Sequence, residues 1–202
     1  MRKFVVLAAL FLTACSEAPK PEAKKAKEPE KPAEPVSGQS AFFLMYTSAR
    51  SWMPDAKGLT LTSMAIDQVK PENGKYGAWR AVFVSESRGR ARPYTYSVVE
   101  SPGNVYKGVF AHHEESYTQR GQNKPFLIAA LKTDTDAVLE TAMKKAADYA
   151  KKFPDKPVTF LLELTPRFPN PAWRVIWGES VGTSNFSIYV DASTGEYLQT
   201  MR

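Results

Sequence analysis

Hydrophobic positions along this chain follow two periods, and the two periods occur in the same order twice. Beginning near residue 41, apolar side chains recur at steps of three and four residues, the spacing of one buried helix face. They then recur at every second residue in short runs, which is typical of strands with one buried face. The same succession begins again after residue 125. The pattern therefore predicts an α+β fold of two tandem repeats, over residues 41–120 and 125–202.

The two predicted helices carry matching apolar stripes. The stripes are Phe42, Tyr46, Ala49 and Met53 in the first helix, and Ala142, Ala146, Tyr149 and Phe153 in the second. Each stripe is followed directly by Pro-Asp, and each predicts one helix face buried against a sheet. Ahead of the second helix we expect residues 126–131 to be an extended lead-in, and Thr133 or Asp134 to be the helix cap.

The predicted strands also come in pairs, and one pair nearly repeats a sequence: AWRAVFVSES begins at Ala78 and AWRVIWGES at Ala172. In the first repeat the three strands carry the alternating sets Leu59/Leu61, Trp79/Ala81/Phe83 and Tyr94/Tyr96/Val98. In the second repeat the corresponding sets are Val158/Phe160/Leu162/Leu164, Trp173/Val175/Trp177 and Phe186/Ile188/Val190. A glycine-containing turn then leads into a fourth strand. We therefore expect each repeat to be one helix packed on an antiparallel sheet of about four strands, with Trp79 and Trp173 in its core.

The offset between the two repeats is not constant. It is 100 residues from Phe42 to Ala142, 94 from Ala78 to Ala172 and 92 from Gly103 to Gly195. Insertions in the loops of the first repeat explain this drift, and the main one is the stretch VKPENGKYG at residues 69–77.

One helix followed by an antiparallel meander, closing with a strand and turn such as IYVDASTGEYL at residues 188–198, resembles a PepSY-type domain. The resemblance covers about residues 38–202 in two copies, and tandem units of this shape also resemble the beta-lactamase inhibitor proteins. PepSY-type domains are associated with binding and inhibiting secreted enzymes, often peptidases, in the cell envelope. The resemblance thus implies a binding module that inhibits or regulates an exported enzyme.

The first fifteen residues, MRKFVVLAALFLTAC, are typical of an export signal, because two basic residues precede an apolar run that ends at small residues. Leu12-Thr13-Ala14-Cys15 resembles the lipobox of bacterial lipoproteins. In that family the cysteine becomes the new N-terminus and carries acyl chains such as palmitate. The resemblance implies membrane anchoring through Cys15 and, because Ser16 follows it, an outer-membrane location facing the periplasm. The alternative is an ordinary secretory signal with an incidental cysteine.

Residues 16–40 consist mostly of proline, lysine, glutamate and alanine. Such a segment has too little apolar surface to offset the entropy of folding, so we expect a disordered tether between the anchor and the first repeat. Prolines at five positions argue against a charged helix there.

The net charge of +6 falls once the basic residues of the signal are removed, so the exported protein is only mildly basic. This charge gives no support for a nucleic-acid partner. Cys15 is the single cysteine, so the repeats have no disulfide available. No sequence feature calls for a cofactor.

One string resembles a catalytic motif, and we expect it to be a turn. Gly178-Glu-Ser180-Val-Gly182 matches G-x-S-x-G, but that motif needs a following helix and a downstream histidine. Here a predicted strand follows, and His112 and His113 both lie upstream. A hydrolase using Ser180 is therefore a remote alternative to a protein that is not an enzyme. Adjacent strand residues point to opposite faces, so the histidine pair predicts no metal site either.

The strongest candidates for partner binding lie at a hairpin tip. Arg88, Arg90 and Arg92 alternate there, and arginine forms bidentate bonds with carboxylates and phosphates. The alternative is that these arginines only keep an exposed edge of the sheet soluble. We also expect Trp177 and Trp52 to be available for contact, and Arg80 and Arg174 to line the outer sheet face. A structural or assembly factor that contacts the cell wall or outer membrane is the alternative function.

Overall fold

The computed structural model describes residues 32–121 and 123–202. The predicted signal peptide, its Cys15 and residues 16–31 of the predicted tether lie outside the described residues. Within the described ranges, no helix combines the length and the apolar character that a membrane span requires.

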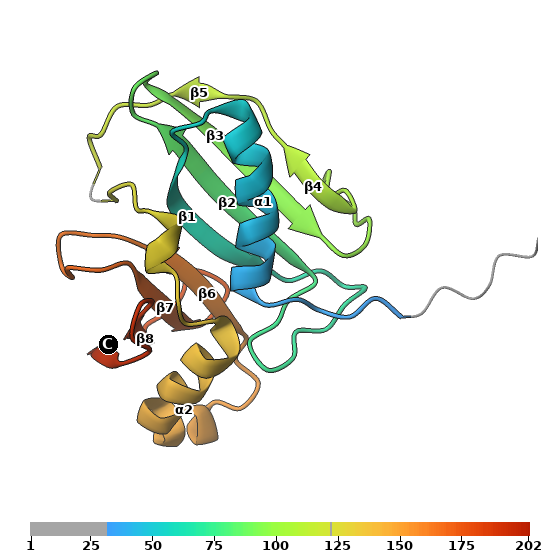
Figure 1. The fold of residues 1–202 in the computed structure, drawn as a ribbon. Helices are drawn as coiled ribbons and strands as arrows, with labels where there is room; N and C mark the ends of the chain where they lie inside the picture. The colour runs from blue at the N-terminus through green and yellow to red at the C-terminus, as the bar shows by residue number, and fades with distance from the viewer. Residues whose placement is uncertain (1–31, 122) are drawn as a thin grey trace, which may run out of the picture. The chain divides into compact units, whose positions relative to one another are not determined.

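The described chain forms two helix-and-strand series in succession (Figure 1). The first contains α1 (Gly38–Trp52), β1 (Lys57–Met64), β2 (Ala78–Ser85), β3 (Arg90–Ser97), β4 (Gly108–Ala111) and the short β5 (Glu115–Ser116). The second contains the 3-10 turn η1 (Ile128–Ala130), α2 (Thr135–Lys152), β6 (Val158–Glu163), β7 (Ala172–Trp177), β8 (Ser187–Asp191) and β9 (Tyr197–Met201).

All strands of the described residues belong to one antiparallel sheet, which corrects the expectation of a sheet of about four strands in each repeat. The nine-stranded sheet has the order β4-β3-β2-β1-β6-β7-β8-β9, and β5 pairs with β3 outside this path. Each half is the predicted helix followed by a meander, but β1 and β6 pair at the centre and join the two meanders. The sequence periods describe each strand alone, so they did not reveal this pairing. That the two halves superpose as true repeats stays a prediction.

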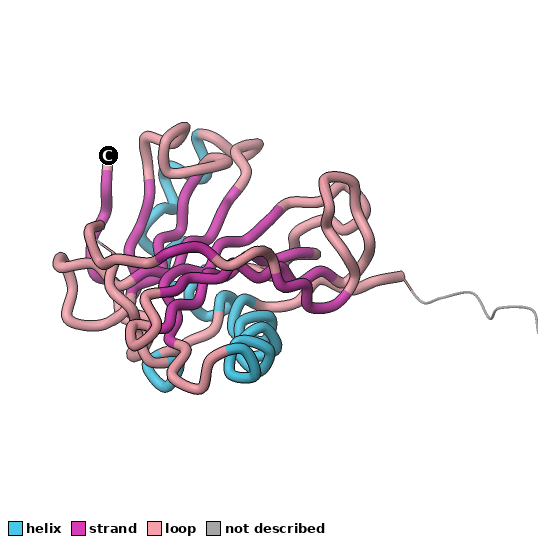
Figure 2. Tube along the Cα trace, turned by 90° about the horizontal axis from the view of Figure 1, so that it is seen from above, coloured by secondary structure: helices cyan, strands magenta, loops and turns pink. Residues whose placement is uncertain are grey.

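Both helices pack on the same face of the sheet. Residues paired across neighbouring strands point to the same side, and Leu61 of β1 pairs with Leu162 of β6 at the centre of the buried face. Helix α1 packs on β1–β4, whereas α2 packs on β7 and β8. The strands change direction across the sheet (Figure 2), as the twist of a large sheet requires. The predicted inward sets Trp79, Ala81 and Phe83 are fully buried, as are Trp173 and Val175.

The N-termini of α1 and α2 meet at the carboxylate of Asp134. Its Oδ1 accepts a hydrogen bond from the backbone N–H of Thr135 at 2.7 Å, which makes Asp134 the cap of α2, one of the two caps predicted. The same oxygen accepts from the backbone N–H of Gln39 in α1 at 3.0 Å. Because helix N-termini carry partial positive charge, one carboxylate stabilises both.

The two repeated tryptophans fasten each sheet half to the start of its helix. The indole N–H of Trp79 donates to the carbonyl of Val36 at 3.0 Å, and that of Trp173 donates to the carbonyl of Thr133 at 3.0 Å. Each acceptor lies two residues before the first residue of its helix. The two rings contact each other edge to face, with centroids 6.4 Å apart. The repeated AWR sequence therefore supplies the same hydrogen bond in both halves.

The folded body begins earlier than the sequence predicted. Val36 pairs with Tyr76, Ser37 caps α1, and α1 starts at Gly38, whereas the tether was expected to extend to Ser40. A Cβ atom on Gly38 would lie 2.7 Å from Cη2 of Trp173, so the close approach of the helix to the tryptophans depends on this glycine. The composition of residues 16–40 as a whole masked this short folded end.

Two local predictions also need correction. Leu61 is buried but Leu59 is only partly so, because the register of β1 against β2 shifts between Gly58 and Thr60. Such a bulge moves the residues on one side of it to the other face. The lead-in at residues 126–131 is extended at Phe126, which pairs with Gly58, and at Leu127, and then turns into η1.

Replacing Asp134 by alanine should lower the free energy of unfolding by about 1 to 3 kcal/mol, because two helix N-termini lose their acceptor together. Urea denaturation followed by circular dichroism measures this change. Asp136→Ala is the matched control, since Asp136 is an exposed acidic residue in the first turn of α2 alone and should cost less than about 1 kcal/mol. Equal losses in the two variants would contradict a shared cap.

Candidate functional site

The candidate site lies where the two halves of the sheet diverge. Strands β1 and β6 pair through Thr60, Leu61 and Thr62 with Glu163, Leu162 and Leu161. By contrast, β1 pairs with β2 from Lys57 to Met64. The joint between the halves is therefore short, and the two strands separate at both of its ends.

At one end, residues 124–126 bridge the gap through backbone hydrogen bonds. Phe126 exchanges two backbone hydrogen bonds with Gly58, at 2.8 and 3.0 Å, beside the start of β1. Two residues earlier, the N–H of Lys124 donates to the carbonyl of Leu164 at 2.7 Å, just beyond the end of β6. Residues 124–126 thus pair with both diverging chains.

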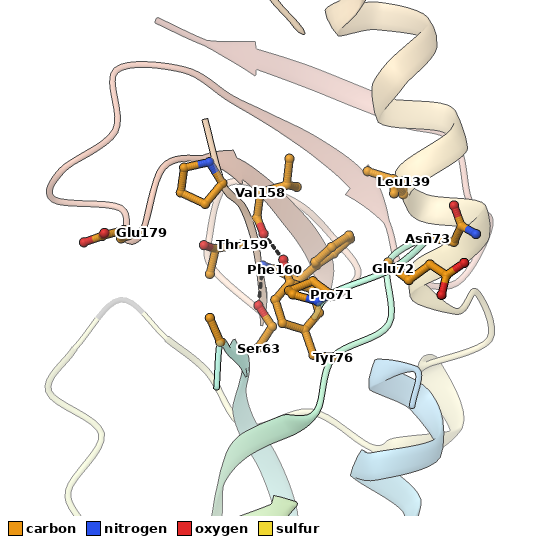
Figure 3. Close-up of a pocket in the computed structure, with 13 residues that line it drawn as sticks. Ser63, Pro71, Glu72, Asn73, Tyr76, Leu139, Val158, Thr159, Phe160 and Glu179 are labelled. Atoms are coloured by element: carbon orange, nitrogen blue, oxygen red, sulfur yellow. Dashed lines mark hydrogen bonds between the residues drawn. The ribbon is translucent and has the colours of Figure 1, made fainter. Parts of the chain in front are cut away.

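At the other end, two hydroxyl groups occupy the edge of β6 in place of a strand. The N–H of Phe160 donates to Oγ of Ser63 at 2.9 Å, and the hydroxyl of Tyr76 donates to the carbonyl of Val158 (Figure 3). Beyond them a cavity of about 580 Å³ opens between the halves. It is lined by Ser63, Ala65, Pro71, Glu72, Asn73, Gly74, Tyr76, Leu139, Pro157, Val158, Thr159, Phe160 and Glu179. We call this cavity the central pocket.

The walls of the central pocket come from both halves. Helix α2 contributes Leu139, whose side chain points toward the pocket from the helix in Figure 3. The loop between β1 and β2 contributes residues 71–74, and this loop lies against the start of α2. Gly74 has a φ of +77°, and a Cβ there would lie 2.4 Å from the carbonyl oxygen of Thr135. Glycine therefore permits both the left-handed turn and its close approach to the helix.

This wall is the insertion VKPENGKYG that disturbs the spacing of the two repeats. The sequence identified this segment as an insertion but did not predict that it lines a pocket. The residues missed by sequence reasoning are chiefly Ser63, Tyr76 and Leu139. The motif expected to be a turn, Gly178–Gly182, also contributes Glu179 to the rim.

Tyr76 is a hydrogen-bond donor at neutral pH. Burial raises the pKa of its phenol to about 12, because the charged phenolate is disfavoured away from water. Its ring contacts Trp79 and Phe160 edge to face, so it is held between the two halves.

A second, more polar cavity of about 440 Å³ lies on the outer face of the sheet. Arg167 and Arg174 lie over the ring of Tyr189, at 5.7 and 5.3 Å from its centroid. Burial raises the pKa of Glu163 in the same cavity, and the charge of Arg174 opposes that shift. Arg80 and Arg174 were predicted to line the outer face, and the strand register agrees. Arg80 pairs with Thr62, Thr62 with Leu161, and Leu161 with Arg174, so both arginines lie on the same face.

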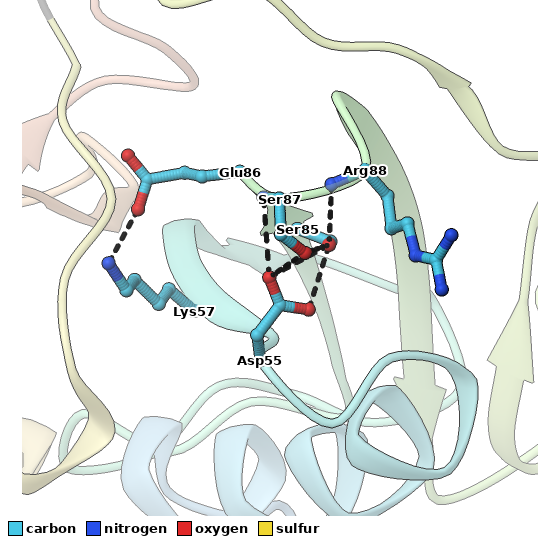
Figure 4. A network of polar contacts seen from close by, with 6 residues as sticks. All are labelled: Asp55, Lys57, Ser85, Glu86, Ser87 and Arg88. Carbon is cyan, nitrogen blue, oxygen red and sulfur yellow. Dashed lines mark hydrogen bonds and ion pairs between the residues drawn. The ribbon is translucent and has the colours of Figure 1, made fainter.

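The three predicted arginines occupy different environments around the tip between β2 and β3. Arg88 is exposed, and its backbone N–H donates to Oγ of Ser85 at 3.3 Å. Its side chain points away from the carboxylate of Asp55, which accepts hydrogen bonds from Ser85 and Ser87 (Figure 4). Those bonds lower the pKa of Asp55, with Ser87 the larger cause. The remaining two arginines make contacts within the protein. Arg90 Nε lies 3.9 Å from Glu114, while Arg92 Nε donates to the carbonyl of His112 at 2.7 Å.

Trp177 is not available for contact, which corrects the prediction made for it. It is 2% exposed because it shares the inward face of β7 with Trp173 and Val175. It packs against Tyr149 and Phe186. Trp52 is partly exposed, and its indole N–H donates to Glu114 at 2.9 Å.

Ser180 lies in the loop between β7 and β8, where the sequence predicted a turn between strands. Its hydroxyl is 3.0 Å from that of Thr183. His112 Nε2 instead lies 2.7 Å from the hydroxyl of Thr95 on the outer face of the other half. Burial, Arg80 and His113 lower the pKa of His112. Among the described residues, no three of the potential metal ligands histidine, cysteine, aspartate and glutamate gather into a group.

Comparisons with known proteins give little more. No protein-family model matches the sequence, and no curated protein matches it significantly. Among solved structures, one described as "a putative lipoprotein" of Clostridium difficile 630 is similar over 85% of this chain and 95% of that chain, with a TM-score of 0.47 and 10% identity. Similarity at this level says nothing about the function of this chain.

The stability of the protein should fall as the pH rises from about 10 to about 12, partly because of Tyr76. A pKa that is raised to about 12 in the folded state favours the neutral phenol, so its contribution is complete below pH 10 and is lost as the pH rises through 12. In Tyr76→Phe this decline should be smaller, although Tyr94, Tyr117 and Tyr189 also have raised pKa values and remain.

Urea denaturation at several alkaline pH values measures the decline. The control is Tyr197→Phe, because the side chain of Tyr197 is exposed and lies far from the joint between the halves in the strand order. A decline that is identical in wild type and Tyr76→Phe would show that Tyr76 is not the buried phenol described here.

Proposed function

We propose that this protein is a lipid-anchored module of the cell envelope that recognises another molecule with its folded body and is not an enzyme. The lipobox sequence ending at Cys15 is the observation that carries the anchoring. The central pocket supports recognition, because it is a concave, mainly apolar site with a few fixed polar groups, as binding sites usually are.

The polar groups of the pocket favour binding over catalysis. The hydroxyls of Ser63 and Tyr76 are engaged by backbone groups of β6. Neither hydroxyl forms a hydrogen bond to a side chain that could act as a general base. The raised pKa of Tyr76 also means that very little of the nucleophilic phenolate is present at neutral pH. Both hydroxyls are placed to form hydrogen bonds with the backbone of a strand, which suits a binding role.

The resemblances described above extend this proposal. Ser16 after the cysteine favours the outer membrane, with the body facing the periplasm. The PepSY-like succession of elements favours an exported enzyme such as a peptidase as the partner, which the module would inhibit or regulate. A structural factor that contacts the cell wall would instead sediment with wall material and would leave such an enzyme fully active.

Replacing Cys15 by serine should abolish lipid attachment and release the protein from the membrane, because the sulfur atom is the site of the first acyl chains. Cells fed an alkyne-bearing palmitate analogue report attachment by click labelling, and membrane fractionation reports location. The control is Ser16→Ala, which keeps the cysteine and should remain labelled. Labelling that persists in Cys15→Ser would contradict the lipobox interpretation.

The arginine tip should contribute to partner recognition if the partner is acidic. In the full chain, Arg88, Arg90 and Arg92 are all replaced by serine, and chemical crosslinking in intact cells measures the yield of the partner adduct. We expect a several-fold lower yield, because arginine pairs with carboxylates more strongly than a neutral residue does.

A matched control removes the same charge from α2. Lys144, Lys145 and Lys151 are replaced together by serine, and the adduct yield should then stay within about twofold of wild type. If both triple variants lower the yield equally, net charge and not the tip governs association. An unchanged yield in both would remove the tip from the binding surface.

A further inference from the structure

We infer that the central pocket takes an extended peptide segment of a partner protein, which enters the gap between β1 and β6 as a short additional strand. This inference rests on the proposed function as a binding module, and it specifies what that module binds. Three features support it: the chain segment at the other end of the joint, the backbone groups on the edge of β6, and the charge of the pocket lining.

The other end of the same joint already holds a segment of this kind. There the N–H of Lys124 donates to the carbonyl of Leu164, and Phe126 exchanges backbone hydrogen bonds with Gly58, so residues 124–126 bridge the two diverging chains. The geometry of the joint therefore accommodates a third chain where β1 and β6 separate. At the pocket end the described residues supply no such chain, and side chains stand in its place.

The edge of β6 presents backbone groups with the spacing of a strand partner. Phe160 N–H and Val158 C=O lie two residues apart and point to the side of β1, since alternate residues of a strand offer their polar groups to the same side. Both groups are now held by rotatable hydroxyls, those of Ser63 and Tyr76. An incoming strand can take over these two bonds, after which the hydroxyls turn toward the peptide or water.

The lining selects apolar residues with a basic neighbour. Leu139, Val158, Pro71 and Pro157 provide apolar wall, and a volume of about 580 Å³ lies within the range of ligand sites. Glu72 and Glu179 are the charged residues that line the pocket, and no lysine or arginine of the described chain joins them there. A segment that alternates apolar residues and carries a lysine or arginine complements both properties.

The test uses the full chain with Cys15→Ser, so that its outcome does not depend on lipid attachment. A randomised library of ten-residue peptides is selected against this protein, and binding of the enriched peptides is measured by fluorescence anisotropy. We expect enriched sequences to alternate apolar residues and to contain lysine or arginine. Methylating alternate backbone nitrogens on the side that pairs with β6 should weaken binding at least about tenfold, because strand addition depends on main-chain hydrogen bonds.

Two variants on the same helix locate the peptide. Leu139→Glu places a charge on the pocket wall and should weaken binding at least about tenfold. Met143→Glu is the matched control, since Met143 lies one turn further along α2 and is 40% exposed, and binding should stay within about twofold. Glu179→Lys should weaken binding of the basic peptides about two- to fivefold, as expected for an exposed charge pair.

A measurement without any substitution in the folded body guards against misfolded variants. Hydrogen exchange followed by NMR should show stronger protection of the amide of Phe160, which faces the pocket from β6, when an enriched peptide is bound. The inference is overturned if selection enriches no peptide, if Leu139→Glu and Met143→Glu weaken binding equally, or if protection at β6 is unchanged. Failure to enrich peptides together with binding of laurate to the pocket would identify an acyl-chain site instead. None of these results bears on lipid attachment at Cys15.

Discussion

The carboxylate of Asp134 is the contact on which the arrangement of the two halves depends. One of its oxygens accepts backbone hydrogen bonds from Thr135 and Gln39, so the starts of both helices converge on one charge. The hydroxyl of Thr135 also accepts from the N–H of Gly38 at 3.1 Å. Two positively polarised helix ends would repel each other without a shared anion. With it, they come close enough for Trp79 and Trp173 to pack together beneath them.

The sequence predicted the parts that local periodicity encodes. It placed the two helices, the order of the strands in each half and the buried positions of Trp79 and Trp173, because periods of 3.6 and 2 record which face of each element meets the core. It did not predict that β1 and β6 join the halves into one sheet, since that pairing links residues about 100 positions apart. The bulge near Leu59 and the role of Gly38 likewise depend on contacts with Phe126 and Trp173.

The candidate site was hidden for a related reason. The segment around residues 69–77 stood out only as an interruption of the repeat, and its function depends on contact with α2 from the other half. The prediction that Trp177 is available for contact was wrong for another reason. The alternation of β7 places Trp177 on the same face as Trp173, so the period of the strand already indicated burial. Arg88 lies in the turn between β2 and β3, whereas Arg90 and Arg92 lie within β3, and the contact of Arg92 with His112 could not be predicted from spacing.

The short joint between the halves explains why a pocket exists where it does. A sheet of this size twists, and strands that pair over three residues must separate on either side of that contact. Residues 124–126 fill one opening and thereby add backbone pairing between the halves. The other opening is spanned by the Tyr76 hydroxyl and by Ser63, which satisfy the edge of β6 without filling the space. A strand bound there would lengthen the joint. A ligand that pairs with both halves binds only while the halves are joined, so its binding would also stabilise their association.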